Sequence, residues 1–261
     1  MNNTKPQTLA AALAQAWTEG LLLPSGGWLA ALNSSEDAYL TQDLLAHRLA
    51  WADVTTGQVR CWKSGGPSRS AELSHAPLAP TGVRMGKADF SDLQLRAPGV
   101  EAEIALRLGE EVSPARAASL GYEEASRLIE AYTVSAELVC SRWLEAGEAP
   151  PLLRQADCLS HGALALGDWI PWSATALPDW SRLDCWIQRN QEAPLRGQGG
   201  HPLQDPAWLL PGWLRHLSRK GMTVPAGTVV TTGAWLSWAE LSPGDSVRLG
   251  FEGLGEIRLS L

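Results

Sequence analysis

Three glutamates have the type and spacing to hold a metal ion. Polar and apolar side chains alternate along residues 99–108, as is typical of a β-strand. Successive strand side chains point to opposite faces, so Glu101 and Glu103 share one face. A third carboxylate, Glu137, lies on another predicted strand, and together they would form the all-oxygen ligand set that Mg²⁺ or Mn²⁺ prefers. Spacing alone leaves a second interpretation open, a solvated outer face on which Arg107 offsets the charge.

These acidic segments belong to a series of short blocks that run in order along the chain. The blocks are Gly99-Val100-Glu101-Ala102-Glu103, Ala136-Glu137-Leu138-Val139-Cys140-Ser141-Arg142, Ala156-Asp157-Cys158-Leu159-Ser160, Gly200-His201-Pro202-Leu203 and Gly227-Thr228-Val229-Val230-Thr231-Thr232-Gly233. In this order they resemble the fumarylacetoacetate hydrolase superfamily. The similarity is greatest to its branch of 2-oxopent-4-enoate hydratases and 4-oxalocrotonate decarboxylases from aromatic meta-cleavage pathways.

The resemblance implies both a fold and a metal-dependent reaction. The implied fold is α+β, with a mixed, strongly bent β-structure and a helical N-terminal part. The implied metal site places Mg²⁺ or Mn²⁺ on Glu101, Glu103 and Glu137. The implied enzyme is a hydratase that adds water to a 2-hydroxy-2,4-dienoate of the 2-oxopent-4-enoate type and forms a 4-hydroxy-2-oxo acid. In such chemistry the metal is a Lewis acid, and a nearby group must move protons.

Three further residues are candidates for catalytic roles. Lys63 precedes a Gly/Ser/Pro loop and matches the lysine of a family block, which makes it the candidate acid/base group or carboxylate anchor. Taken by itself, Lys63 is more simply interpreted as a surface lysine. Thr232, beside Gly233, is a candidate donor to a substrate oxygen, although a turn residue is the plainer interpretation. Ser160 matches a family position that lines or braces the site.

The sequence also departs from the family pattern near the expected site. Cys140 and Cys158 stand where the branch usually has Asp and Asn, and residues 78–82 lack the carboxylate expected near a Pro-x-x-Gly. Other functions therefore stay open. One is a metal-dependent decarboxylase of a 2-oxo-3-enedioate of the 4-oxalocrotonate type. A C–C bond hydrolase would need a base such as a Glu–His pair, and the sequence shows no convincing pair. The third alternative to a hydratase is a non-catalytic relative that acts as a binding or partner subunit.

Composition limits the partners. The chain of 261 residues has a net charge of −7 and no basic cluster, which argues against nucleic-acid binding. No apolar run approaches the ~20 residues that span a bilayer. The four cysteines lack C-x-x-C spacing, so we expect reduced thiols in a cytoplasmic protein rather than a zinc site. We therefore expect a small 2-oxo or 2-hydroxy acid as substrate, and the family implies a homo-oligomer.

The chain has the organisation expected of one domain over residues 1–261. Residues 1–60 are predicted to be mainly helical, with a helix over residues 8–17 and another that Ser34 caps. Residues 61–261 are predicted to form the β-rich catalytic core. One helical interruption is expected at residues 122–132, where apolar side chains recur at helical spacing.

Overall fold

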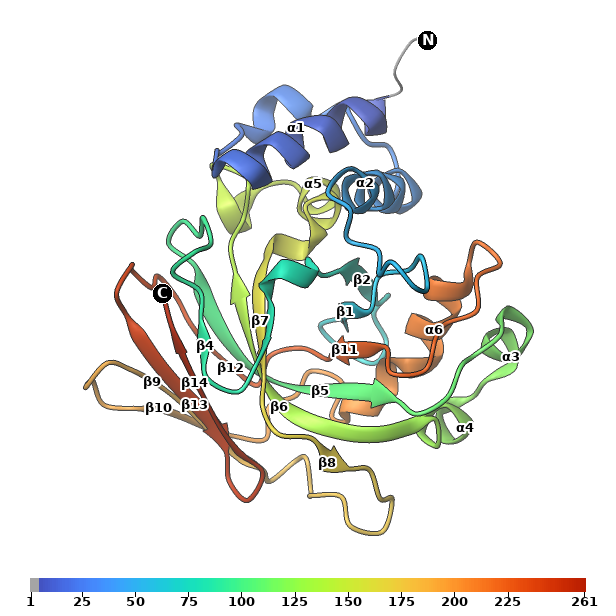
Figure 1. The fold of residues 1–261 in the computed structure, drawn as a ribbon, viewed down its shortest axis with the longest axis vertical. Coiled ribbons are helices and arrows are strands. Elements are labelled where there is room, and N and C mark those ends of the chain that lie inside the picture. Colours follow the sequence, from blue (N-terminus) through green and yellow to red (C-terminus); the bar gives the residue numbers. More distant parts are fainter. Residues whose placement is uncertain (1–4) are drawn as a thin grey trace.

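The computed structural model describes residues 5–261 and shows an α+β fold with helices at the N-terminal end (Figure 1). The α-helices are α1 (Lys5–Glu19), α2 (Ser35–Arg48), α3 (Pro114–Ser119), α4 (Tyr122–Ser126), α5 (Pro151–Ala156) and α6 (Leu210–Ser218). The strands are β1 (Cys61–Gly65), β2 (Ser74–Pro77), β3 (Val83–Met85), β4 (Ala88–Asp89), β5 (Gly99–Leu108), β6 (Ile129–Val139), β7 (His161–Leu166), β8 (Ile170–Pro171), β9 (Asp184–Arg189), β10 (Leu195–Gln198), β11 (Val229–Thr231), β12 (Leu236–Trp238), β13 (Ser246–Phe251) and β14 (Gly255–Ser260). The predicted class, with its helical N-terminal part, is confirmed.

Two sheets form the β-structure. The larger sheet has the order β2-β1-β11-β5-β6-β7-β3, with β12 also paired to β5 and β8 to β6. Its pairs β1–β11 and β3–β7 are parallel, whereas β5–β6 is antiparallel, so the sheet is mixed as predicted. The other sheet has the order β10-β9-β13-β14-β4. The long strands β5 and β6 curve strongly across the middle of the molecule (Figure 1).

Strand β5 separates the main core from the three glutamates. Its apolar side chains enter the core and are Ala102, Ile104, Leu106 and Leu108. Glu101 and Glu103 occupy the opposite face, as strand periodicity requires. The register with β6 places Glu101 opposite Glu137 and Glu103 opposite Ser135. Because residues directly opposite each other share a face, pleat and register together bring the carboxylates to one side of the sheet.

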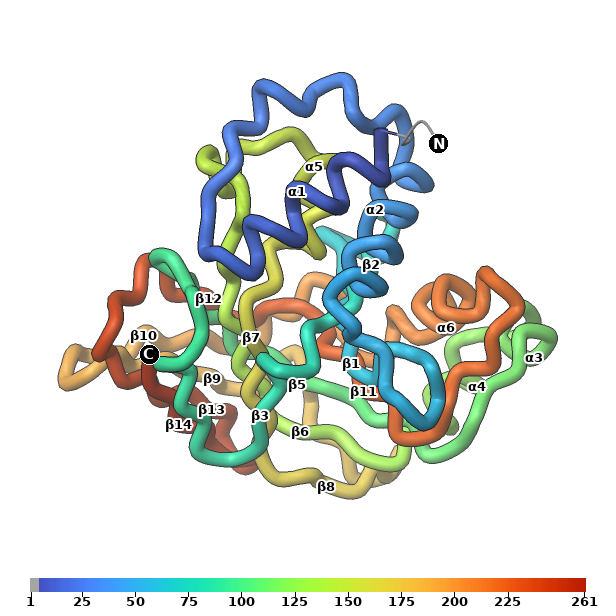
Figure 2. Tube along the Cα trace, turned by 45° about the horizontal axis from the view of Figure 1, so that its top comes forward, coloured from blue at the N-terminus to red at the C-terminus, as the bar shows by residue number. Residues whose placement is uncertain are grey.

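The N-terminal helices form a layer with α5 over one end of the larger sheet (Figure 2). Ser34 caps α2 as predicted, since its hydroxyl accepts a hydrogen bond from the Asp37 N–H at 3.3 Å. Leu13 of α1, Leu45 of α2 and Leu153 of α5 belong to one buried apolar cluster. None of the helices in the described part of the chain is long and apolar enough to cross a membrane.

The helix predicted over residues 122–132 is wrong beyond its first turn. Helix α4 ends at Ser126, and β6 begins at Ile129. Tyr132 is buried, but it is buried through antiparallel pairing of β6 with β5 rather than on a helix face. The β-branched Val134 follows and favours a strand, so long-range pairing outweighs the local helical spacing.

Candidate metal centre

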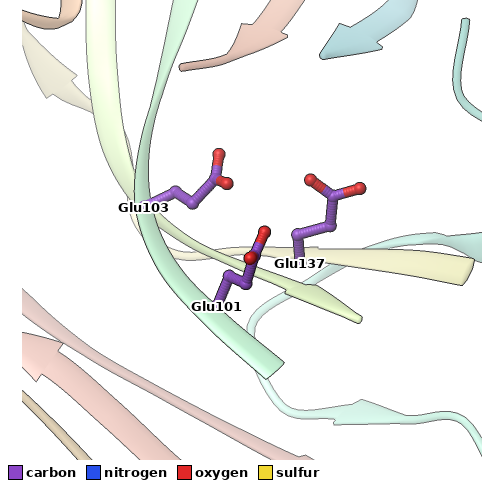
Figure 3. A group of neighbouring side chains, drawn as sticks. All are labelled: Glu101, Glu103 and Glu137. Carbon is purple, nitrogen blue, oxygen red and sulfur yellow. The ribbon is translucent and has the colours of Figure 1, made fainter. Parts of the chain in front are cut away.

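Glu101, Glu103 and Glu137 point toward a common space (Figure 3). One oxygen of each carboxylate lies within 4.8 Å of one oxygen of each of the others. Glu101 stands directly opposite Glu137 in the β5–β6 ladder, a position in which like charges destabilise a sheet. Glu103 is 2% exposed and Glu137 is 0% exposed. Water therefore does little to screen the repulsion between negative charges within this group of three carboxylates.

Glu103 and Glu101 are fixed from β11, β12 and the segment that joins them. The carboxylate of Glu103 accepts hydrogen bonds from the Gly233 N–H at 3.0 Å and from the hydroxyl of Thr231. Glu101 accepts a longer one from the hydroxyl of Ser237, at 3.4 Å. The two carboxylates on β5 are therefore held by segments more than a hundred residues away in sequence.

The two carboxylate oxygens of Glu137 differ in their hydrogen-bond partners. Its Oε1 accepts a hydrogen bond from Lys63 Nζ at 2.7 Å and lies 3.3 Å from His161 Nδ1. Its Oε2 is buried and has no hydrogen-bond partner among the described residues. A buried carboxylate oxygen without a partner is unfavourable unless a cation or another donor meets it.

The carboxylates and the ammonium group of Lys63 shift one another's pKa values. Burial, followed by the charges of Glu137 and Glu101, raises the pKa of Glu103 to about 8. Burial also acts to raise the pKa of Glu137, but Lys63 and His161 outweigh it and lower this pKa. Burial acts to lower the pKa of Lys63, and the carboxylates, led by Glu137, outweigh it and raise this pKa. At neutral pH, Lys63 is therefore charged and Glu103 holds a proton.

Strand β1 brings Lys63 to the carboxylates because it pairs with β11, which pairs with β5. The ammonium also donates to the carbonyl of Leu159 at 3.2 Å, and the side chain is 13% exposed. A cavity of about 250 Å³ opens beside it, lined by Lys63, Ser64, Gly65, Gly66, Ser74, Glu101, Glu103, Leu159, Gly233 and Ala234. Among these described lining residues Lys63 is the one cation.

The turn that supplies the carbonyl partner of Lys63 has an uncommon backbone. Residues 158–160 have φ values of 48°, 54° and 61°, a left-handed conformation that costs a non-glycine residue about 1–2 kcal/mol. A buried ion pair braces this turn, with Arg142 Nε 2.5 Å from Asp157 Oδ1. The same guanidinium donates to the backbone carbonyls of Asp157 and His161, on either side of the turn.

Ser160 and Thr232 lie next to the described cavity wall rather than in it. Ser160 follows Leu159, which does line the cavity. The hydroxyl of Thr232 donates to the carbonyl of Ile104 at 2.7 Å, whereas the preceding Thr231 contacts Glu103. The catalytic roles of Ser160 and Thr232 therefore stay predictions, and Thr231 is the threonine that the structure brings to the carboxylates.

The two cysteines that replace family residues are buried. Cys140 Sγ accepts a hydrogen bond from the Arg96 N–H at 3.3 Å. Cys158 is fully buried, and burial raises the pKa of its thiol above the ordinary value. The thiol of Cys158 is therefore neutral and lies within the turn at residues 158–160, and the Cys140 N–H donates to the carbonyl of Ser160 in the same turn at 2.6 Å.

His161 is a site residue that the sequence interpretation did not single out. It is fully buried and faces Glu137, so the structure contains a Glu–His pair that the sequence did not reveal. The one signal in the sequence is that His161 directly follows the block at residues 156–160. Its pKa is lowered, chiefly by burial, so the imidazole is neutral at neutral pH.

The donor set fits a hard divalent cation. All three converging ligands are carboxylates, and the buried Oε2 of Glu137 lacks a partner among the residues described. Oxygen ligands of this kind are what Mg²⁺ and Mn²⁺ prefer. Once Glu103 loses its proton, Lys63 alone cannot balance three carboxylate charges, and a divalent ion would balance the remainder.

A family comparison agrees with this geometry. The family model described as fumarylacetoacetate (FAA) hydrolase C-terminal matches residues 69–261. The chain belongs to the fumarylacetoacetate hydrolase family. The matched region contains the three glutamates, and Lys63 lies just before it.

Among curated proteins, 2-keto-4-pentenoate hydratase 1 of Dechloromonas aromatica (strain RCB) is 31% identical over 170 residues, 63% of this chain. The match spans 60% of that relative's length.

Solved structures share the family fold. The 4-oxalocrotonate decarboxylase from Pseudomonas putida G7, complexed with magnesium and adipate, has a TM-score of 0.81 at 20% identity and matches 100% of this chain and 98% of that one. Fumarylpyruvate hydrolase from Pseudomonas aeruginosa, in complex with Mn²⁺ and pyruvate, has a TM-score of 0.54 at 15% identity over 77% of this chain and 88% of that one. The predicted superfamily and fold are confirmed, and the similarity to a hydratase and to a decarboxylase supports the predicted branch.

The raised pKa of Glu103 predicts that the metal-free protein loses stability between about pH 6.5 and 8. The folded protein keeps a proton that the unfolded chain releases above 4.5, so the free energy of unfolding falls as pH rises to about 8. His75, His201 and His216 have lowered pKa values and act in the opposite direction, but only below their ordinary value of 6.5. The expected decline over this window is up to about 2 kcal/mol.

Urea unfolding in EDTA at pH 6.5, 7.2 and 8.0 measures this decline, with Glu103→Gln as the matched control. The glutamine variant has no proton to lose at this position, so its stability should change less over the same window. Saturating Mg²⁺ should remove the decline in the unsubstituted protein, because metal binding replaces the proton. An equal slope in both proteins would contradict the assignment of the proton to Glu103.

Proposed function

We propose that this protein is a metal-dependent hydratase that converts a 2-hydroxy-2,4-dienoate of the 2-oxopent-4-enoate type to a 4-hydroxy-2-oxo acid. The supporting observation is a cavity that combines a carboxylate cluster with Lys63 as the one cation in its described wall. Bound Mg²⁺ or Mn²⁺ would supply a Lewis acid for the substrate's carboxylate and 2-oxygen. The 31% identity to a 2-keto-4-pentenoate hydratase supports the same reaction class.

In this proposal, one group of residues binds the metal and another residue transfers a proton. Glu101, Glu103 and Glu137 would hold the cation, and Thr231 and the Gly233 N–H orient Glu103. Lys63 lines the cavity, is protonated, and lies beside Glu137. We assign to Lys63 the proton that the dienol receives at its far end before water adds, a step in which a placed acid contributes about 10²–10⁴-fold.

A decarboxylase of a 2-oxo-3-enedioate is the second candidate. Its substrate has the same metal-binding end, and a solved decarboxylase shares the fold over the whole chain. That substrate carries a second carboxylate at its far end. The described wall of the cavity offers no cation besides Lys63, and an unpaired carboxylate enters such a site unfavourably. This favours a substrate with one carboxylate, and hence hydration.

The Glu137–His161 pair does not favour a C–C bond hydrolase. His161 is fully buried and absent from the described cavity wall, so its imidazole is shielded from a water molecule beside the substrate. Glu137 belongs to the carboxylate cluster, so it is not free to activate water with His161.

A direct assay tests the proposed reaction. Purified protein with Mg²⁺ or Mn²⁺ and freshly generated 2-hydroxypenta-2,4-dienoate should remove the conjugated absorbance and form 4-hydroxy-2-oxopentanoate, and EDTA should stop the reaction. The same protein should turn over 2-oxohex-3-enedioate poorly. Rapid CO₂ release from that diacid would assign the protein as a decarboxylase. Metal binding without turnover of either compound would favour a non-catalytic relative.

A further inference from the structure

Glu137 is held by two groups on the same oxygen. Lys63 Nζ lies 2.7 Å from Oε1, and His161 Nδ1 lies 3.3 Å from it, while Oε2 has no partner in the described chain. Glu137 and His161 are both fully buried, so neither contact competes with bulk water. This arrangement ties Oε1 to the protein and leaves Oε2 as the oxygen available to a cation.

The surroundings of His161 decide which ring nitrogen carries the proton. Its Nε2 is buried and has no hydrogen-bond partner among the residues described. A proton on Nε2 would leave a buried N–H unpaired and would turn the Nδ1 lone pair toward a carboxylate oxygen, and both are unfavourable. A proton on Nδ1 instead donates to Glu137. His161 is therefore a hydrogen-bond donor to this carboxylate.

The backbone and ring of His161 are themselves fixed. Its carbonyl accepts a hydrogen bond from the guanidinium of Arg142, which also pairs with Asp157. The guanidinium lies over the ring of Trp17 at 4.1 Å, and that ring lies 6.1 Å from the imidazole. Trp17 belongs to α1, so the N-terminal helical layer lies beside the imidazole of His161.

We infer that His161 is a positioning residue for the metal centre, which holds Glu137 by its Oε1 so that Oε2 remains available to a divalent cation. The inference rests on the metal site of the proposed function, and it adds a residue that contacts a ligand rather than the metal. Groups that orient metal ligands in this way typically contribute about 10–100-fold to metal affinity. Because Lys63 holds the same oxygen, removal of His161 should weaken the site without destroying it.

Calorimetric titration of Mg²⁺ and Mn²⁺ into the EDTA-treated protein tests this inference. His161→Leu removes the donor while filling the space, and it should raise the metal Kd by about 10–100-fold. His161→Asn places an amide N–H near the position of Nδ1 and should restore an affinity close to that of the unsubstituted protein. His216→Leu is the matched control, since His216 is another largely buried histidine with an unpaired Nε2 but lies outside the carboxylate cluster.

Each outcome of the titration has one meaning. Unchanged affinity in His161→Leu would overturn the role of His161, and so would an Asn variant as weak as the Leu variant. Absence of metal binding in the unsubstituted protein would overturn the proposed metal site itself. If His161→Leu does not fold, as judged by circular dichroism, His161→Gln takes its place. Its amide reaches the position of Nε2 instead of Nδ1, and so it should bind metal weakly.

Discussion

Glu103→Gln should abolish divalent-cation binding and dienoate turnover together. The substitution keeps the size of the side chain but removes the charge from the ligand that Thr231 and the Gly233 N–H orient. Loss of the Lewis acid removes several kcal/mol of stabilisation from the transition state, which corresponds to a rate loss of roughly 1,000-fold or more. Titration with Mg²⁺ and the dienoate assay measure the two effects on the same preparation.

The matched control for this substitution is Glu110→Gln. Glu110 is an exposed glutamate that pairs with Arg116 and belongs neither to the described cavity wall nor to the carboxylate cluster, so both metal affinity and turnover should be retained. The glutamine at position 103 should also leave the metal-free protein folded, because it replaces a carboxyl group that is protonated at neutral pH. Turnover by Glu103→Gln that persists in EDTA would contradict the metal-dependent mechanism.

The glutamate cluster could be predicted because two local signals agreed. Period-two alternation placed Glu101 and Glu103 on one strand face, and the block order identified Glu137 as the third member. Their convergence depends on the β5–β6 register, in which Glu101 faces Glu137. A shift of the register by one residue would turn Glu137 to the opposite face, so the local pattern defines the candidates and the register makes them a site.

Contacts between distant segments could not be predicted from the sequence. Thr231 and Thr232 are adjacent and chemically alike, and only the pairing of β11 with β5 shows that Thr231 meets Glu103. His161 carries no motif of its own, and its role depends on the left-handed turn at residues 158–160 that precedes it. The helix expected at residues 122–132 failed for a related reason, since pairing with a distant strand outweighed the local spacing.

Lys63→Met should reduce turnover by about 100-fold or more while metal binding is retained or becomes tighter. Lys63 is the one cation of the described cavity wall and lies 2.7 Å from Glu137. Its loss removes the proposed proton donor. It also removes a positive charge that repels a divalent cation beside it, so the affinity for Mg²⁺ should not fall. Metal titration and the dienoate assay separate this variant from Glu103→Gln, in which both properties are lost.

Lys63→Arg distinguishes the two roles open to this residue. Arginine keeps the positive charge but does not release a proton near neutral pH, so it can anchor a carboxylate but cannot act as an acid. If Lys63 moves the proton, the Arg variant should be as slow as the Met variant, whereas an anchoring role predicts substantial recovery. Lys220→Met is the control, because Lys220 is 57% exposed and pairs with Asp43 at the surface. Full activity in Lys63→Met would contradict both roles of Lys63.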